Sequence, residues 1–496
     1  MKKESLFIIS LAAMLLMACN GIETGGIDDD TVITKHKTSL IRDVNVTQNE
    51  AIGIANMFAR SNAGSDISQT KGAFLSTKMI SSSETIREDG QNLMYVFNYE
   101  GGGFVIVGST RNYYPILAYS DEGSFVLQED MGPVDVWLDE TKVSIKNSSS
   151  LDNDTKAQMQ NLWERYDGTF VDPAQELLAV RRPQTRSTGE DACWERIDSL
   201  TLEHGSEGWT YLPLSLVEDL FTDLGLVSYY DAICYSAYQN NSALNETVIG
   251  FRNPVHKQVG PVIGTAWRQW GAFGKLCPNL KAGCGAVAAG QIMYYYKRPT
   301  VMNLVDTTFT WASADIPKSE NQNSKQPHLM RMLGQKFQMD YRPDGQSATN
   351  TNKILIGLDS LGYVAYSAAH NTWTAKNEIL VYGRPLIMFG SDTTSPLDDG
   401  HYWVCEGAHE IIYDAIEFYT DNQPGGAGDF SQGMYSYSSP GVVGGSIYYH
   451  YFYMNWGAGY VNDPNMKYNG WFASNDVEFY EGNPQYLRTN IYVSLP

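Results

Sequence analysis

Residues 281–296 read KAGCGAVAAGQIMYYY, and the expected fold depends on this stretch. Small and apolar residues of good helix propensity continue until Pro299 closes the run, which predicts a buried helix with Cys284 in its first turn. Gly283 and Gly285 flank the cysteine, and we expect them to leave its sulfur open to a substrate. At a helix N-terminus the macrodipole favours thiolate over thiol. The alternative is a buried cysteine that serves only as a small hydrophobic residue.

A histidine suited to pair with this thiol lies in residues 398–407, DDGHYWVCEG. Residues 384–390 read as a buried strand, and His401 opens the next one. A histidine at the start of a strand, beside a glycine, can point into a cleft and exchange a proton with a thiol. His409 is the rival, although the Gly407-Ala408 pair before it resembles a turn. The simpler interpretation of His401 is a structural histidine.

Two further side chains complete a possible catalytic set. An alternating aromatic strand at 449–454 delivers Asn455 and Trp456 at its end. The Asn455 carbonyl can accept a hydrogen bond from the imidazole and fix its orientation, while Trp456 shields that bond from water. Upstream of Cys284, the amide of Gln269 can donate to a developing oxyanion alongside the backbone N–H of the cysteine. The order Gln, Cys, His, Asn-Trp is more specific than any member alone.

Composition sets the wider limits. The chain has 496 residues, which suggests about three structural units. With 43% hydrophobic and 12% aromatic residues, bulk disorder is excluded. A net charge of −21 repels phosphate backbones and argues against nucleic-acid binding. The 32 Tyr, 11 Trp and 45 Gly favour a β-rich, extracytoplasmic protein.

The N-terminus resembles an export signal. Lys2 and Lys3 precede an apolar run at 6–17 that is too short to span a hydrocarbon core of about 30 Å. Residues 16–19, LMAC, match the lipobox of bacterial lipoproteins. We therefore expect a signal peptide at 1–18, lipidation of Cys19, and a flexible Gly-rich, acidic tether over 19–44.

The expected location follows from this signal. Asn20 stands where inner-membrane lipoproteins often carry Asp, which favours the outer membrane, on its periplasmic or surface face. No later segment approaches 18 consecutive apolar residues, so the only membrane contact we expect is the N-terminal lipid. Release after maturation and an ordinary signal peptide that happens to contain a cysteine are the alternatives.

The cysteines add one constraint on the chemistry. Acylation of Cys19 leaves an odd number of cysteines, so at least one thiol stays unpaired in a compartment that permits disulfides. No CxxC pair occurs and the eight histidines lack zinc-site spacing, so we expect neither a metal nor an organic cofactor. The six cysteines are Cys19, Cys193, Cys234, Cys277, Cys284 and Cys405.

Residues 45–147 form the expected N-terminal unit. Residues 47–60 begin with Thr47 and carry Glu50 three positions later, the pattern of a capping box that leads an amphipathic helix. Nothing in this unit offers a nucleophile or a base, so a folding or covering role is expected. Strand-like runs follow at 93–98, 103–108 and 114–119, with a turn at 121–123 and a second helix at 134–145.

Two connecting regions follow this unit. Residues 148–258 are the expected junction and maturation region, with an exposed, protease-accessible stretch at 181–191 that includes Arg186. Within the junction, 208–212 and 227–238 read as strands or connections and 214–226 as a short helix. The catalytic core is expected over 259–496.

Together these motifs resemble the streptopain group of papain-like cysteine proteases, the C10 peptidases. The resemblance rests on GCGAVAAGQIMYYYKRP around Cys284, on DGHYWVCEG around His401, and on the aromatic strand that ends in Asn455-Trp456. It implies that Cys284 is the nucleophile and His401 its proton acceptor and donor. It also implies that Gln269 contributes to the oxyanion hole and that Asn455 and Trp456 support the histidine.

The resemblance also implies the architecture. The expected fold class is α+β: a papain-like two-lobed protease, helical lobe plus twisted antiparallel sheet, preceded by a small α+β inhibitory prodomain at 45–147. Two departures stand out, because Ala458 replaces a tryptophan common in this family and residues 420–446 form a long Gly/Ser/Tyr-rich insertion. This insertion is a substrate-gating loop or a surface hairpin.

The expected function is a lipid-anchored cysteine endopeptidase made as a zymogen. It would hydrolyse peptide bonds of protein or peptide substrates through a Cys-His dyad and a thioester acyl-enzyme. Its own prodomain would be an intramolecular inhibitor. The alternatives are a catalytically silent lipoprotein that binds peptides or host proteins on the same fold, and an amidase or transglutaminase-like enzyme with the same chemistry.

Overall fold

The computed structural model describes the chain from residue 43 onward, with gaps. The described residues are 43–63, 78–129, 131–166, 188–204, 210–218, 227, 230–231, 234–235, 248–252, 255–392, 400–412, 415–421, 430–436, 448–457, 468–474 and 486–496. The expected signal peptide, Cys19, most of the tether, Arg186 and Ala458 lie outside them, as does most of the 420–446 insertion.

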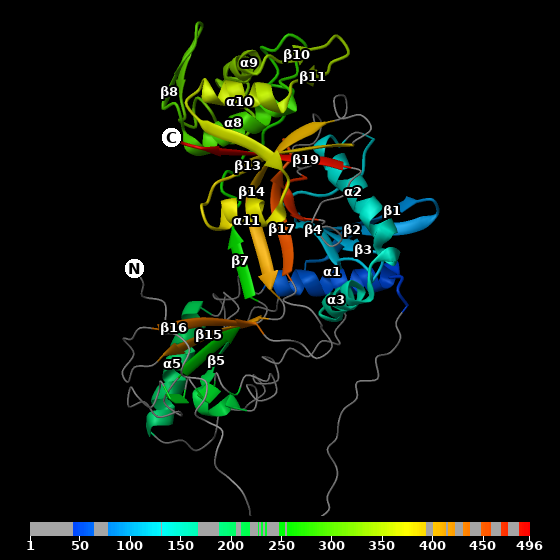
Figure 1. Ribbon diagram of the computed structural model, residues 1–496, viewed down its shortest axis with the longest axis vertical. Coiled ribbons are helices and arrows are strands. Elements are labelled where there is room, and N and C mark those ends of the chain that lie inside the picture. The colour runs from blue at the N-terminus through cyan, green and yellow to red at the C-terminus, as the bar shows by residue number, and fades with distance from the viewer. Residues whose placement is uncertain are drawn as a thin grey trace, which may run out of the picture. The chain divides into compact units, whose positions relative to one another are not determined.

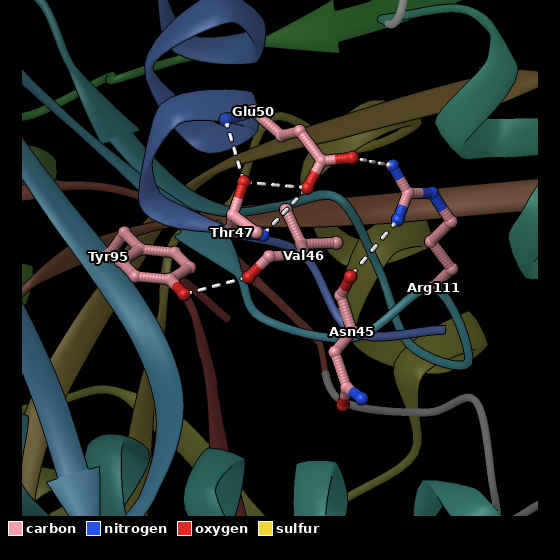
Figure 2. A network of polar contacts seen from close by, with 6 residues as sticks. All are labelled: Asn45, Val46, Thr47, Glu50, Tyr95 and Arg111. Atoms are coloured by element: carbon pink, nitrogen blue, oxygen red, sulfur yellow. Dashed lines mark hydrogen bonds and ion pairs between the residues drawn. The ribbon is translucent and has the colours of Figure 1, made fainter. Parts of the chain in front are cut away.

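The N-terminal unit begins with the predicted capping box. Helix α1 (Gln48–Ala63) starts after Thr47, whose N–H donates to Glu50 Oε2 at 2.8 Å while its Oγ1 accepts from the Glu50 N–H at 3.3 Å. Figure 2 shows that Arg111 closes the network from the far side of Glu50, at 2.9 Å. Burial opposes ionisation of Glu50, but the hydrogen bonds from Thr47 and Arg111 outweigh it and lower its pKa to about 2.

The rest of this unit is a four-stranded antiparallel meander with two helices. The predicted strands and second helix are confirmed, while β1 and α3 are additions that the sequence pattern did not indicate. Strand β1, ISSSETIRE, is mostly polar and exposed because it forms the edge of the sheet, so it lacks the apolar alternation that marks a strand. The elements are β1 (Ile80–Glu88), β2 (Gln91–Tyr99), β3 (Phe104–Gly108), β4 (Ile116–Ser120), α2 (Pro133–Asn147) and α3 (Asn153–Glu164).

The N-terminal meander continues into the sheet of the C-terminal half. Strand β4 pairs with β18, with Tyr119 opposite Trp471 and Ala118 opposite Phe472. The resulting 11-stranded sheet runs β1-β2-β3-β4-β18-β17-β14-β13-β19-β12, and β7 also pairs with β14 (Figure 1). The strands after β4 are β7 (Val255–Val259), β12 (Val364–Ala369), β13 (Leu386–Asp392), β14 (His401–Ile412), β17 (Tyr448–Asn455), β18 (Gly470–Ala473) and β19 (Tyr486–Ser494).

Strand β14 corrects one prediction. Gly407 and Ala408 do not form a turn but lie inside this 12-residue strand, and His409 is therefore a buried strand residue. Glycine is a poor strand former by propensity, but Gly407 has a packing reason to be there. A Cβ at this position would lie 2.7 Å from Tyr453 Cβ and 3.0 Å from the Trp471 ring.

Helices form the second layer of the C-terminal half. Together with the antiparallel sheet, they confirm the predicted α+β class. Figure 1 shows α8, α9 and α10 grouped together, beyond the β13 and β19 strands. The helices are α8 (Cys284–Tyr296), α9 (Gln326–Lys336), α10 (Thr351–Asp359) and α11 (Thr372–Leu380), accompanied by the short strands β8 (Val301–Asn303), β9 (Thr308–Thr310), β10 (Asp340–Tyr341) and β11 (Ser347–Ala348).

Two strands of the expected junction region pair with two strands from the C-terminal half of the chain. The resulting four-stranded sheet has the order β16-β15-β6-β5. Helix α5 begins at Thr188, so the last part of the stretch predicted as an exposed junction is helical. Only Leu214–Leu216 of the predicted 214–226 helix is described as a helical turn. The elements are α5 (Thr188–His204), β5 (Thr210–Pro213), β6 (Val248–Arg252), β15 (Ala415–Asp421) and β16 (Phe430–Ser436).

Two hydrophobic cores meet at the main sheet. One extends from the N-terminal unit to residues such as Trp403 and Cys405, and the other surrounds α8 and includes Tyr402 and Val404. Because successive strand residues point to opposite faces, β14 supplies side chains to both cores. Among the described residues no helix is long and apolar enough to cross a membrane.

Large aromatic side chains join the N-terminal unit to the C-terminal half. Tyr114 stacks on Tyr449 with ring centroids 4.1 Å apart and an interplanar angle of 10°. Trp137 of α2 packs edge-on against Phe472, and its Nε1 donates to the Ala473 carbonyl at 3.2 Å. This contact is therefore built like a domain interior, and the two parts share one folding unit.

We expect Trp137→Ala to lower the free energy of unfolding by about 3–5 kcal/mol, because the fully buried ring leaves a cavity and Ala473 loses its donor. Urea titration of the full chain measures this loss. Tyr382→Ala is the matched control, since its ring is 61% exposed and its removal should cost under about 1 kcal/mol. A Trp137→Ala loss as small as that of the control would contradict a shared core.

A polar chain crosses the same interface. The Tyr119 hydroxyl of β4 lies 3.1 Å from His409 Nδ1, and His409 Nε2 lies 2.9 Å from His256 Nδ1 on β7. Burial and the neighbouring His256 lower the pKa of His409 to about 3. The folded protein therefore keeps His409 neutral at pH values where the unfolded chain protonates it.

The sign of the pH dependence follows. As pH falls through the ordinary histidine pKa of 6.5 towards 3, the unfolded chain takes up a proton that the folded His409 refuses, so stability is lost. At about pH 5 this loss should reach about 2 kcal/mol. His409→Gln should shrink the difference in unfolding free energy between about pH 7.5 and pH 5 by that amount. An unchanged difference in denaturant titrations would contradict the neutral, buried His409.

Candidate active site

Cys284 is the first residue of α8, as the sequence predicts. Gly283 precedes the helix with φ of 89°, a left-handed conformation that favours glycine. A Cβ on Gly283 would lie 2.8 Å from Met339 Cε, and one on Gly285 would lie 3.0 Å from Ile354 Cδ1. The glycines therefore allow neighbouring groups to pack tightly against the helix start, which differs from the expectation that they leave open space beside the sulfur.

The electrostatics of the half-buried Cys284 also differ from expectation. Burial raises the pKa of the thiol above its ordinary value of 9.0, while backbone N–H groups of Tyr402 and Gly285, and the charge of Lys281, oppose this only in part. The helix start does supply donors to the sulfur. Desolvation is nevertheless the larger effect, so in this state of the protein the surroundings of the sulfur favour the neutral thiol.

His401 is the first residue of β14, and the backbone of this strand lies beside the Cys284 sulfur. The Tyr402 N–H, one residue after His401, is one of the donors to Cys284. The Tyr402 ring lines the same corner, with its hydroxyl 3.0 Å from Thr351 Oγ1 and its Cδ2 3.5 Å from the Cβ position of Gly285. The fold thus brings together two segments that are more than a hundred positions apart in the sequence. The proton-transfer role of His401 stays a prediction.

The N-terminal unit contacts the strand that pairs with His401. Gly390 of β13 is directly opposite His401 in the ladder. A Cβ at Gly390 would lie 2.8 Å from Val136 Cγ1 of α2, and 2.8 Å from the Trp403 ring. Helix α2 therefore packs where the two strands run side by side, next to the histidine.

The Gln269 segment lies beside the helix that begins at Cys284. The Gln269 backbone carbonyl accepts from the Ala282 N–H at 2.6 Å, and the Gln269 side chain is only 7% exposed. Ala282 is two residues before Cys284, so this bond fixes the Gln269 segment beside the start of α8. The predicted oxyanion role of its side chain is compatible with this placement and stays a prediction.

Asn455 is fully buried in a polar network that sequence reasoning did not foresee. Its carbonyl oxygen accepts from Gln291 Nε2 at 2.8 Å, and its Nδ2 donates to the Thr265 carbonyl at 2.7 Å and to Glu406 Oε1 at 2.8 Å. The carbonyl expected to orient His401 is thus engaged by α8. The motif still reaches the site, since a Cβ at Gly457 would lie 3.1 Å from Val287 of α8.

Trp456 lies in an aromatic cluster that packs against β14, the strand that begins at His401. Its ring is 5.2 Å from Trp403 and 4.9 Å from Phe472, measured between centroids. Its backbone N–H donates to Asn469 Oδ1 at 3.1 Å. The expected shielding role is consistent with this burial, but the contacts are with the core of the sheet. They do not test whether Trp456 covers a His-Asn bond.

Sequence reasoning missed Glu406, Gln291 and Thr265. Each left a signal: Gln291 is polar in an otherwise apolar helix, two turns after Cys284 on the same face, and Glu406 is charged inside a hydrophobic strand. A buried polar residue in an apolar segment indicates a partner. Among the described residues no cluster of three or more His, Cys, Asp or Glu side chains is placed to hold a metal ion.

Two family models match the chain, one in its N-terminal half and one in its C-terminal half. Residues 43–145 match the family model of the Spi protease inhibitor, and residues 267–464 match that of the peptidase C10 family. No curated protein matches the chain.

Two solved structures from Prevotella intermedia are similar to the chain. A prointerpain A fragment has a TM-score of 0.42 and 13% identity, covering 83% of this chain and 97% of that one. The active interpain A cysteine protease has a TM-score of 0.31 and 18% identity, covering 47% and 94%. By these two family models, a region that matches the Spi protease inhibitor family precedes a region that matches the peptidase C10 family.

Proposed function

We propose that the protein is a cysteine endopeptidase made as a zymogen. The observation that carries this proposal is the junction of α8 and β14, where the ring of Tyr402, the residue after His401, lies 3.5 Å from the Cβ position of Gly285, next to Cys284. A thiol at a helix start beside a histidine strand, in a domain of a peptidase family, is the arrangement that acyl transfer requires.

The proposed reaction proceeds by acyl transfer. Proton transfer from Cys284 to His401 creates the thiolate, which attacks the peptide carbonyl carbon and forms a C–S bond. Gln269 and the Cys284 backbone N–H stabilise the oxyanion. The C–N bond then breaks as His401 donates its proton to the departing amine. Finally His401 takes a proton from water, which attacks the thioester and releases the acid and the Cys284 thiol.

The N-terminal domain is proposed to inhibit the enzyme within the same chain. Three features support this: its match to a protease inhibitor family, the packing of α2 against the strand opposite His401, and a Cys284 thiol whose pKa is raised by burial. Activation requires an ionised thiol, so opening the site to water or to the imidazolium must lower that pKa. Cleavage within 181–258, near Arg186, by the enzyme itself or by another protease, is the proposed maturation step.

Export and lipidation are proposed from the sequence. The lipobox at 16–19 supports acylation of Cys19 and anchoring in the outer membrane. Substrates of such an enzyme are proteins or peptides reached from the periplasmic or surface side, and the proposed mechanism uses only side chains of the chain itself.

The raised pKa generates a first test. In the intact full chain, the alkylation rate of Cys284 by iodoacetamide should rise with pH along a curve whose midpoint lies above 9.0, because only the thiolate reacts and burial disfavours it. Mass spectrometry of the peptide that contains Cys284 separates it from the other free cysteines. After maturation the midpoint should move to lower pH. A midpoint well below 9.0 in the uncleaved chain would contradict a silenced thiol.

A second test concerns the nucleophile. Cys284→Ala should lower hydrolysis of a protein substrate by at least about 1,000-fold, because no other group can form the thioester. The full-length variant should also stay unprocessed unless active enzyme is added. Cys277→Ala is the matched control, since this buried cysteine is outside the proposed site, and it should process and hydrolyse normally. Full activity of Cys284→Ala with an unchanged melting temperature would remove the assignment.

A further inference from the structure

Glu406 occupies a β-bulge in β14. The β14–β17 ladder passes from Cys405 opposite Met454 to Gly407 opposite Tyr453, which leaves Glu406 as the extra residue. Bulges redirect a side chain out of the regular alternation. The Glu406 side chain is completely buried, with 0% exposure. A buried carboxylate is costly unless its oxygens are fully hydrogen-bonded, so its partners reveal what it does.

All three partners of this carboxylate are N–H donors. Oε2 accepts from the backbone N–H groups of Ile263 at 2.5 Å and Gly264 at 2.7 Å, and Oε1 accepts from Asn455 Nδ2 at 2.8 Å. A proton on either oxygen would face a donor instead of an acceptor. Burial raises the pKa of Glu406 above its ordinary value of 4.5, while the hydrogen bonds from Asn455, Gly264 and Ile263 lower it in part. The geometry matches the ionised form, in which both oxygens accept and neither has to donate.

The charge decides which way the Asn455 amide faces. Its NH₂ group must point to Glu406 and to the Thr265 carbonyl, so its carbonyl oxygen points to Gln291 of α8. Gln291 is two turns along the helix that begins at Cys284. The carboxylate thereby links the Asn-Trp-Gly end of β17 to the nucleophile's helix.

The same carboxylate holds the segment that leads to Gln269. Besides the two N–H bonds to its side chain, the Glu406 backbone carbonyl accepts from the Val262 N–H at 3.0 Å. Five residues after Gly264, the Gln269 carbonyl bonds to Ala282 beside the start of α8. The Glu406 side chain, on the strand that begins at His401, thus contacts the end of β17 at Asn455 and the segment that leads to Gln269.

We propose that Glu406 is a positioning residue of the hydrolase, whose buried carboxylate holds Asn455 and the Gln269 segment in register with β14. This rests on the proposed peptidase function. Glu406 does not touch substrate. It acts through the alignment of the thiol, the histidine strand and the oxyanion donors, which a substrate senses mainly in the transition state.

The test compares two buried carboxylates of the same strand in the matured enzyme. Glu406→Gln places an NH₂ group against donors, so kcat should fall about 100-fold with KM nearly unchanged. Glu406→Asp keeps the charge, but its side chain is too short to reach Asn455 and the N–H groups of Ile263 and Gly264 together. We therefore expect it to retain part of the kcat that Glu406→Gln loses. Glu410→Gln is the control, because Glu410 is 3% exposed and bonds to Lys376 and His450, away from Asn455. It should lose stability but keep kcat.

The outcomes separate the alternatives. Equal losses of kcat in Glu406→Gln and Glu410→Gln, in proportion to lost stability, would show a merely structural role and overturn the inference. So would an unchanged kcat in folded Glu406→Gln. If that variant does not fold, Glu406→Asp decides, since an unchanged kcat there contradicts positioning. A wild-type enzyme without hydrolysis would overturn the proposed function first, and the inference with it.

Discussion

Strand β14 is buried on both faces, and both hydrophobic cores are built on it. Every residue after His401 is buried along its length, so the alternation of side chains must satisfy two different environments at once. Tyr402 and Val404 belong to the core around α8, whereas Trp403 and Cys405 belong to the core shared with the N-terminal domain. A one-residue slip would exchange these sets, so the register of β14 is strongly specified.

This constraint couples the inhibitor domain to the proposed active site. The N-terminal meander does not rest on the peptidase domain as a separate cover: β4 extends the sheet through β18, and the aromatic contacts of Tyr114 and Trp137 are as tight as a domain interior. On the opposite face of the same strand, the Tyr402 backbone contacts Cys284. Removal of the domain therefore changes packing on one side of a strand whose other side lies against the helix that begins at Cys284. That is a direct physical route from the proposed cleavage to the proposed activity.

The polar residues around Asn455 have a structural role in the proposed site. Glu406, Gln291 and Thr265 have no group that performs acyl transfer, yet through Asn455 they connect the four segments that carry the proposed catalytic side chains. Such a network is favourable only when every donor and acceptor in it is matched. The bulge at Glu406 and the close approach at Gly407 are the backbone features that allow it to form.

Several helices and strands could be predicted from the sequence alone. The Thr47–Glu50 capping box, the helix that starts at Cys284 and the strand ending at Asn455 each have a clear local sequence pattern, and each was predicted. The order of the four motifs was enough to suggest the family. The edge strand β1 was not predicted because its exposed, polar sequence lacks apolar alternation. The Gly407-Ala408 pair was expected to form a turn, but pairing with Tyr453 and Phe452 of β17 places it inside β14.

Only the tertiary structure decided the rest. The sharing of one sheet by two domains, the neutral His409 between Tyr119 and His256, and the partners of Glu406 all join segments separated by 49 residues or more. The raised pKa of Cys284 belongs to this group too, since desolvation depends on everything packed around the sulfur and opposes the local effect of the helix start. Local pattern specifies an element, but burial and long-range register determine what its side chains meet.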